Sequence, residues 1–205
     1  MRKSVFIIVL ILLSSQISAQ SNWKRFWNQS APHKMWVLFH PCKAKKASEI
    51  SYEATKVSDS IAKTDLLDKD LAGGQVDAFR HAYWMARLQQ EIGRRAAISL
   101  GKAHEKDNYR TFKKKQTENG IVPDQASKEM DLYNNKVGLR YSEKGILTSK
   151  TELTHKIVNA ILMGDLKVIK KDTIGNYLTC EGALIPSEEL HHSWQNTKCL
   201  IPSNK

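Results

Sequence analysis

The chain has 205 residues, of which 41% are hydrophobic and 26% are charged, and its formal net charge is +11. These values fit one ordinary globular domain, and the sequence contains no internal repeat or low-complexity segment. The basic charge favours anionic partners such as phospholipid headgroups or phosphorylated wall polymers, although a merely soluble basic protein has the same composition. The sequence lacks both the aromatic-interleaved basic pattern of a single-strand binder and a recognition-helix signature, so it predicts no specific nucleic-acid motif.

The N-terminal segment, residues 1–19, predicts a secretory signal peptide. A basic start over residues 1–3 precedes an apolar run over residues 5–13, and a small residue, Ala19, ends the segment. The apolar run is too short to span a bilayer, and no later segment approaches twenty apolar residues. We therefore expect cleavage after Ala19, export to the periplasm or out of the cell, and a single mature domain over residues 20–205 without a transmembrane segment.

An aromatic-rich segment over residues 21–39 predicts one or two helices. These helices would dock on the body of the domain or, alternatively, contact a membrane surface through tryptophans next to basic residues. His40, Pro41 and Cys42 predict a turn. Residues 47–65 then predict a helix, because apolar residues recur there at helical spacing.

The next predicted helix, over residues 75–92, contains no helix breaker and follows a flexible Gly73–Gly74 pair. Asp77 and His81 are four residues apart, which places both side chains on one face within reach of a single ion or substrate group. Trp84 continues the same face, which is otherwise apolar, and we expect it to support the site. A carboxylate and an imidazole on a core-facing strip cost free energy unless something pairs with them, so the two residues indicate a site.

A second polar cluster ends the following helix, which is predicted over residues 96–105 after a break at Gly93. This cluster consists of His104 and Glu105. A polar, lysine-rich loop is predicted over residues 106–124, either over the site or beside it.

A third polar cluster lies on a helix that is predicted to begin with Ser127 as its N-cap and to end at Gly138. Its members are three and four residues apart, so they share one face of that helix: Asp131, Asn134 and Asn135.

One more helix and an irregular tail are predicted at the C-terminus. The helix begins at Thr151 or Thr154 and ends at Gly164. The tail covers residues 165–205, in which Val168–Ile169 and Tyr177–Leu178 could pair as a small β-hairpin. The expected fold class is therefore mainly α: one compact multi-helix bundle whose central motif region covers residues 73–138.

The chain has three cysteines, Cys42, Cys180 and Cys199. In an oxidising compartment one disulfide is plausible, and Cys180 with Cys199 would close a loop over the tail, although Cys42 could pair with either of them. No two cysteines have the close spacing of zinc ligands, so a zinc site built from them is not expected.

The three polar clusters together predict a site for a divalent ion, because helical bundles build such sites from inward-facing side chains. Zinc would use His81, His104 and a carboxylate and leave a position for water. Magnesium or manganese would depend on Asp77, Asp131 and Asn135. The same side chains could instead form a buried polar network that fixes the packing of three helices without an ion.

Three motifs in this order resemble a bacterial domain family of unknown function. They are Asp-Ala-Phe-Arg-His-Ala-Tyr-Trp at 77–84, Ala-His-Glu at 103–105 and Met-Asp-Leu-Tyr-Asn-Asn-Lys-Val-Gly at 130–138. Members of this family are small secreted proteins or C-terminal modules of larger surface and toxin-like proteins. The resemblance implies a largely helical domain and carries no established activity. A weaker likeness is to helical metal-dependent phosphohydrolases with a His…His-Asp…Asp signature, in which Glu105 stands where an Asp is expected.

The leading hypothesis is an exported metal-assisted hydrolase of a phosphoester or another anionic envelope substrate. The ion would be held by His81, His104 and Asp131, with Asn135 nearby, and Glu105 or Asp77 would be the general base. Arg80 would bind the anionic group, or it could pair with Asp77 or a helix end. Asn134 would support the site. One alternative is a non-catalytic envelope or interaction protein with a structural polar network, and another is an antibacterial toxin-type module.

Overall fold

The computed structural model of the protein describes residues 29–117, 121–146 and 148–205, and the predicted signal peptide lies outside these ranges. The fold is mainly helical, as predicted. Among the described residues, no helix combines the length and apolar character needed to cross a bilayer. In chain order the elements are α2 (Ala31–Phe39), α3 (Pro41–Ile61), α4 (Gln75–Ile92), α5 (Arg94–Lys113), α6 (Gln125–Gly138), α7 (Lys150–Met163), β1 (Lys167–Ile169), α8 (Ser187–His192) and β2 (Leu200–Pro202).

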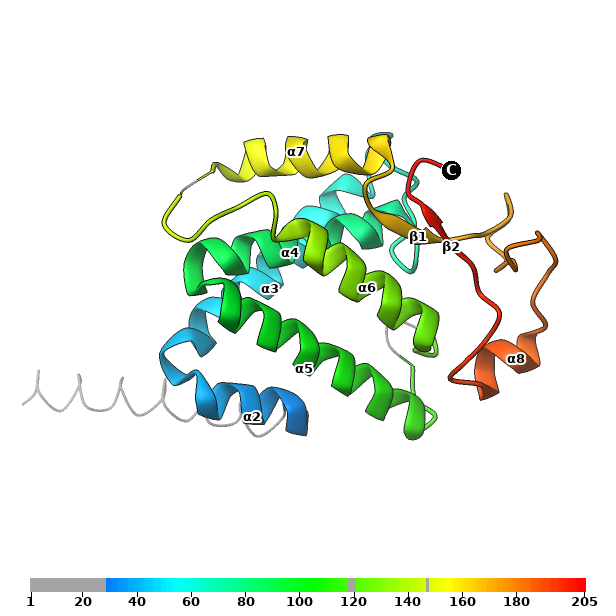
Figure 1. The fold of residues 1–205 in the computed structure, drawn as a ribbon, viewed down its shortest axis with the longest axis horizontal. Helices are drawn as coiled ribbons and strands as arrows, with labels where there is room; N and C mark the ends of the chain where they lie inside the picture. The colour runs from blue at the N-terminus through cyan, green and yellow to red at the C-terminus, as the bar shows by residue number, and fades with distance from the viewer. Residues whose placement is uncertain (1–28, 118–120, 147) are drawn as a thin grey trace, which may run out of the picture.

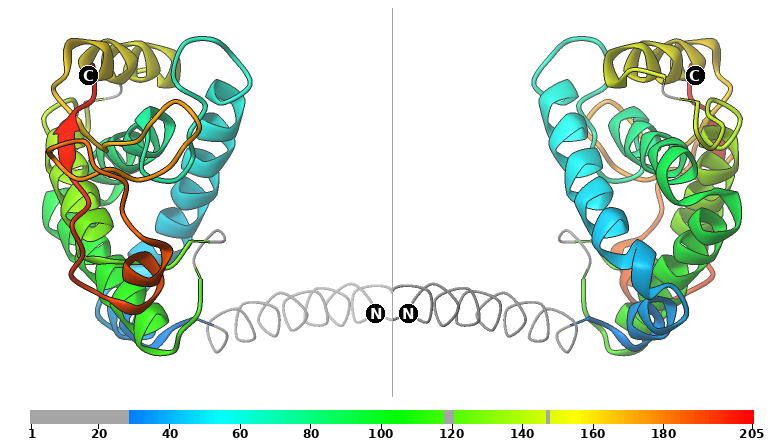
Figure 2. Two further views of the ribbon diagram at one scale, coloured as in Figure 1. Left: turned by 90° about the vertical axis from the view of Figure 1, so that its right-hand side faces the viewer. Right: turned by 90° about the vertical axis from the view of Figure 1, so that its left-hand side faces the viewer.

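Helix α4 is the centre of the fold. It packs against α3, α5, α6 and α7, and Figures 1 and 2 show α3 on one side of it and α5 and α6 on the other. Every residue of α4 is buried except Gln75, Arg80 and Glu91. A helix buried on all sides is usually apolar all round, yet α4 buries Asp77 and His81. This departure from the usual composition indicates a site.

The boundaries of α3 and α5 differ from the prediction at both ends. The predicted turn at His40–Cys42 is wrong because α3 begins at Pro41, and proline suits the first turn of a helix, where its missing N–H is not needed. The predicted loop over residues 106–124 is wrong in its first part because α5 continues to Lys113. Tyr109 and Phe112 pack against Trp194 of the tail, with ring centroids 4.8 and 5.3 Å apart, and this long-range contact supports the extra turns.

The ends of α6 and α7 are formed by polar caps and a glycine. The Asp124 side chain accepts a 2.8 Å hydrogen bond from the backbone N–H of Ser127, so Asp124 is the N-cap and the predicted cap lies in the first turn. Ser149 caps α7. Gly164 ends α7 with a φ of 84°, a left-handed conformation that favours glycine.

A small two-stranded sheet is present near the C-terminus, but its strands differ from the predicted hairpin. β1 pairs antiparallel with β2, and the predicted pairing of Val168–Ile169 with Tyr177–Leu178 is therefore wrong. Tyr177 instead forms an isolated bridge with Lys171. A disulfide joins Cys180 to Cys199, directly before β2, and Cys42 is exposed and free.

Strand β1 forms hydrogen bonds both to the loop before α4 and to α6, the two helices that carry Asp77, His81 and Asp131. The Ile169 N–H donates to the Gly73 carbonyl, in the loop before α4, at 2.7 Å. The Asn134 side chain, on α6, both donates to and accepts from the Lys167 backbone, with two hydrogen bonds of 2.9 Å. Asn134 therefore has a structural partner, and the tail holds the start of α4 and the middle of α6 in one arrangement.

Candidate metal centre

Asp77 lies in the first turn of α4. Its Oδ2 accepts a 2.7 Å hydrogen bond from the backbone N–H of Gly73, whose φ of 95° is readily adopted only by glycine. The N–H groups at the start of a helix favour a negative charge at this position. The loop and the helix therefore fix one oxygen of the carboxylate, and the other oxygen, Oδ1, faces His81 and Arg80.

His81 lies one turn further along α4, and Asp131 approaches it from α6. His81 Nε2 is 3.5 Å from Asp77 Oδ1 and 3.3 Å from Asp131 Oδ1. All three residues are buried, and one ligand atom from each lies within 4.8 Å of the others. The structure thus brings together three residues that the sequence analysis assigns to the site, from two different helices.

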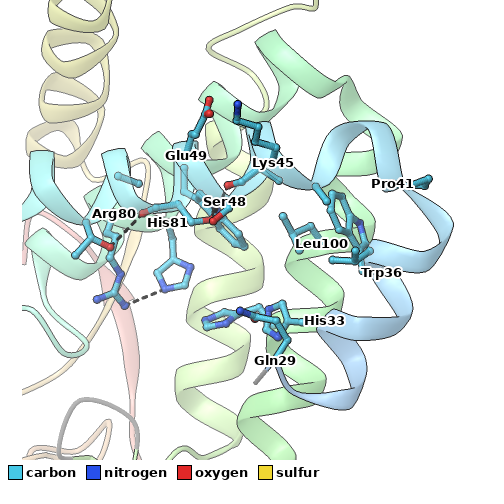
Figure 3. A pocket seen from close by; sticks show the side chains of 18 residues that line it. Gln29, His33, Trp36, Pro41, Lys45, Ser48, Glu49, Arg80, His81 and Leu100 are labelled. Carbon is cyan, nitrogen blue, oxygen red and sulfur yellow. Dashed lines mark hydrogen bonds between the residues drawn. The ribbon is translucent and has the colours of Figure 1, made fainter. Parts of the chain in front are cut away.

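Arg80 contacts the same atoms. Its Nη2 is 2.6 Å from Asp77 Oδ1 and 3.3 Å from His81 Nε2, and Figure 3 shows the guanidinium beside the imidazole. The Arg80 side chain is 23% exposed, whereas that of His81 is 3% exposed. Arg80 is therefore the member of the cluster with the most freedom to turn toward solvent.

Asn135 lies on α6 one turn after Asp131. Its side-chain amide is buried, and neither its oxygen nor its nitrogen makes a hydrogen bond of good geometry within the described residues. Gly101 lets α5 come close to it, since a Cβ at that position would be 3.3 Å from Asn135 Nδ2. The amide also lies within hydrogen-bonding reach of the His81 side chain, so Asn135 is placed to contact an ion or a water held beside His81.

His104 and Glu105 lie beside this group rather than within it. The His104 ring is 6.0 Å from the His81 ring and 5.8 Å from the Trp84 ring, measured between centroids. Within the described residues, the group of converging ligand atoms includes neither His104 nor Glu105. Glu105 is buried on α5, where Asn108 Nδ2 lies 3.4 Å from its Oε2.

A pocket of about 720 Å³ lies beside the cluster, between α2, α3, α4 and α5. Arg80 and His81 line one end of it, and Trp36 and Pro41 line the other (Figure 3). His104 also lines the pocket, whereas Asp77 and Asp131 are not among its described lining residues. The histidines and Arg80 therefore separate the two buried carboxylates from the pocket.

Helix α2 contributes to this pocket, which the sequence did not predict. The aromatic-rich segment was expected to pack on the domain or to contact a membrane surface, yet His33, Trp36 and Val37 line the pocket. Their spacing at i, i+3 and i+4 puts them on one helix face, which was the available signal.

The histidines at the cluster are neutral at neutral pH. Burial, followed by the charges of Arg80 and His104, lowers the pKa of His81 well below its usual value. Burial, with smaller effects from His33 and Arg80, lowers the pKa of His104 to about 4. Burial also raises the pKa of Asp77, although Arg80 opposes this rise. A neutral imidazole is the form that binds a metal ion or accepts a proton.

We expect the protein to lose stability as the pH falls from 7 to 5. The unfolded chain takes up protons on His81 and His104 near pH 6.5, whereas the folded protein resists this uptake because both pKa values are lowered. The raised pKa of Asp77 acts in the opposite direction, because the folded protein binds this proton more readily than the unfolded chain does. The melting midpoint should therefore fall by several degrees at pH 5, and His104→Gln should reduce this fall. An equal or higher midpoint at pH 5 would contradict the buried neutral histidines.

Two of the distances among the converging atoms match the spacing of metal ligands, and all three atoms lie within 4.8 Å of one another. In a tetrahedral site with bonds of about 2.0–2.1 Å, ligand atoms lie about 3.3–3.4 Å apart. The distances from His81 Nε2 to the two carboxylate oxygens are 3.5 and 3.3 Å. The charges of the ionised side chains would also suit a cation, because the carboxylates of Asp77 and Asp131 together carry two negative charges against the single positive charge of Arg80. A divalent ion would make this group positive overall, and so attractive to an anion.

Residues 34–165 match a protein family described as a domain of unknown function, DUF6973. This range includes α4, α5 and α6 with their three polar clusters, whereas His33 lies just before it. No curated protein and no solved structure matches the chain.

Proposed function

This chain belongs to the DUF6973 family of domains of unknown function, and we propose that it is a metal-dependent hydrolase of a phosphoester or a similar anionic substrate. The observation that carries the proposal is the buried group of Asp77, His81 and Asp131, whose ligand atoms converge beside a pocket that Arg80 also lines. We also propose that the protein acts after export, on the strength of the signal peptide that the sequence predicts.

The proposed ion ligands are Asp77 Oδ1, His81 Nε2 and Asp131 Oδ1, with the Asn135 amide beside them. A divalent ion held there would lower the pKa of a coordinated water into the neutral range. Neutral imidazole and two carboxylates are donors that suit zinc or manganese. Asp77 thus takes the role of a ligand in place of the general base suggested by the sequence.

His104 is the proposed general base. It lines the pocket, and its ring is 6.0 Å from that of His81. Burial keeps it neutral at neutral pH, so a ring nitrogen is free of charge, while its pKa of about 4 makes it a weaker base than an exposed histidine. Glu105 is not among the described residues that line the pocket, so we do not assign it this role.

Arg80 is proposed to bind the anionic group of the substrate. Its Nη2 and a metal ion would compete for Asp77 Oδ1 and His81 Nε2, which it contacts at 2.6 and 3.3 Å. Because the side chain is partly exposed, it can turn into the pocket when an ion binds. The guanidinium would then offer a planar pair of donors to two phosphate oxygens.

The direct test is hydrolysis of bis(p-nitrophenyl) phosphate by the mature protein with added zinc, manganese or magnesium. We expect turnover that requires the ion and stops with a chelator. His104→Gln should lower kcat about 100-fold without changing ion affinity. His155→Gln is the matched control, because His155 is exposed on α7 and is not a described lining residue of the pocket. Bound ion without turnover of this diester or of p-nitrophenyl phosphate would count against a phosphoester hydrolase.

A second candidate function is structural, and the short contact between Arg80 and Asp77 favours it. A guanidinium 2.6 Å from a buried carboxylate can satisfy that carboxylate without any ion. Arg80→Gln separates the two candidates. If the cluster is purely structural, the melting midpoint falls and divalent ions have no effect. If it is a metal centre, ion affinity is unchanged or higher, because a competing cation has been removed, and KM rises.

A further inference from the structure

The wall of the pocket away from Arg80 is mixed in character. It includes the apolar side chains Val37, Ala44, Ala47, Ala54 and Leu100 and the indoles of Trp36 and Trp84. Lys45, Ser48 and Glu49 also line it (Figure 3). A soluble phosphoester would leave the apolar part of this wall uncovered.

Both tryptophans in the pocket wall have their N–H groups bound to the protein. Trp36 Nε1 donates to Ser99 Oγ at 2.8 Å and approaches the Ala96 carbonyl at 3.2 Å. Trp84 Nε1 donates to Ser51 Oγ at 2.9 Å. With these donors engaged, the indoles present carbon to the pocket. The indole faces are therefore surfaces on which a hydrocarbon chain can pack.

The volume of the pocket is large enough for a ligand bigger than a phosphate group. A pocket of about 720 Å³ lies within the range that encloses a drug-sized molecule. It therefore has space for an alkyl chain in addition to a phosphate group at Arg80.

We propose that this pocket binds a lipid-like amphiphile, with a phosphate or phosphoester head at Arg80, His81 and His104 and an alkyl chain between α2 and α3. The assignment of such a molecule as substrate rests on the proposed hydrolase function, whereas its binding does not. Two features of the ligand are testable: its alkyl chain, which a soluble phosphoester lacks, and its anionic head, which a cationic amphiphile lacks.

Binding is measured by titration calorimetry with dodecyl phosphate below its micelle concentration, and with ethyl phosphate and dodecyltrimethylammonium as partial ligands. Dodecyl phosphate should bind roughly 100-fold or more tightly than ethyl phosphate, because the chain buries apolar surface. It should also bind at least tenfold more tightly than the cationic amphiphile. Equal affinity for dodecyl and ethyl phosphate, or for the two amphiphiles, would overturn the proposal.

Two serine variants on α3 test whether the alkyl chain binds in this pocket. Ser48 is exposed and lines the pocket, so Ser48→Trp should obstruct it and weaken dodecyl phosphate binding at least tenfold. Ser60 is also exposed on α3 but is not a described lining residue, so Ser60→Trp should leave binding unchanged. Equal effects of the two variants would place the alkyl chain elsewhere.

The outcomes distinguish this proposal from the hydrolase function. Hydrolysis of bis(p-nitrophenyl) phosphate without any preference for a long chain would refute the amphiphile and leave the hydrolase standing. Tight, Ser48-dependent binding of dodecyl phosphate without turnover of any ester would refute the hydrolase and leave the amphiphile site. Competition by anionic vesicles distinguishes the source of the ligand. If the protein takes the ligand from a bilayer, the vesicles should compete with dodecyl phosphate. If the site binds only free amphiphiles, the vesicles should not compete.

Discussion

Asp131→Asn should reduce divalent-ion affinity by about 100-fold or more and abolish ion-dependent turnover. The substitution keeps the shape of the side chain but removes the charge that lies 3.3 Å from His81 Nε2. Changes to groups that only orient metal ligands typically cost about 10–100-fold in affinity, so the loss of a ligand charge should cost at least as much. The measurement is a calorimetric titration of zinc and manganese into chelator-treated protein.

Glu129→Gln is the matched control for this variant. Glu129 lies on the same helix, is exposed, and loses the same charge on substitution. It should therefore leave ion affinity within about twofold, apart from a small effect that salt screens. Equal losses in the two variants would mean that Asp131 acts only through the general charge of the protein.

Gly138→Ala should destabilise the protein by about 3 kcal/mol, at the upper end of the usual cost of overpacking. A Cβ at this position would lie 2.2 Å from the Ala82 carbonyl oxygen and 2.7 Å from Ala82 Cα. These are backbone atoms of α4, which cannot move aside as a flexible side chain would. The two helices must separate, and because α4 carries His81 and α6 carries Asp131, the variant should also weaken ion binding.

Gly101→Ala is the control for the glycine variant, and unfolding in urea is the measurement. A Cβ at position 101 would meet the Asn135 side chain at 3.3 Å rather than backbone. Alanine is also favoured over glycine inside a helix by about 1 kcal/mol. Gly101→Ala should therefore destabilise the protein much less than Gly138→Ala. Similar urea midpoints for Gly138→Ala and the unmodified protein would show that α4 and α6 are not in such close contact.

The sequence predicts the central helices well because their signals are local. Residues 75–92 contain no breaker and form α4 without change. Gly93 and Gly164 end helices through backbone conformations that glycine adopts easily. The pairing of β1 with β2 depends instead on contacts between distant residues, including Asn134 with Lys167. Periodicity carries no information about such contacts, and the same is true of the extension of α5 under Trp194.

In the candidate site, too, the sequence predicts the local arrangement along a helix but not the contacts between distant segments. Spacing along one helix places Asp77 near His81, and the structure adds Asp131 from α6. The pairing of Arg80 with Asp77, three residues away, is one of the alternatives that the sequence offers, and the structure confirms it. Spacing does not reveal the additional contact of Arg80 with His81. Nor does it reveal that Asn134 is occupied by the Lys167 backbone. These contacts depend on side-chain conformation and on the tail, which become known only in the folded protein.

A separate, partly exposed network around Glu53 differs from the proposed metal centre. The Glu53 carboxylate accepts hydrogen bonds of 2.8 Å from both Tyr83 and Arg87, and Lys150 Nζ lies 2.6 Å from its other oxygen. One carboxylate thus has three donors. The proposed centre differs because its two carboxylates, Asp77 and Asp131, come within 3.5 and 3.3 Å of the Nε2 atom of one imidazole, an atom that can bind a metal ion.

The most direct test of the metal centre is the metal content of the purified mature protein after equilibrium dialysis against zinc, manganese and magnesium, measured by mass spectrometry. We expect one ion of zinc or manganese per chain in the unmodified protein and a much lower content in Asp131→Asn. An ion content in the unmodified protein no higher than in Asp131→Asn, for all three metals, would contradict the metal centre and leave the structural network as the account of these residues.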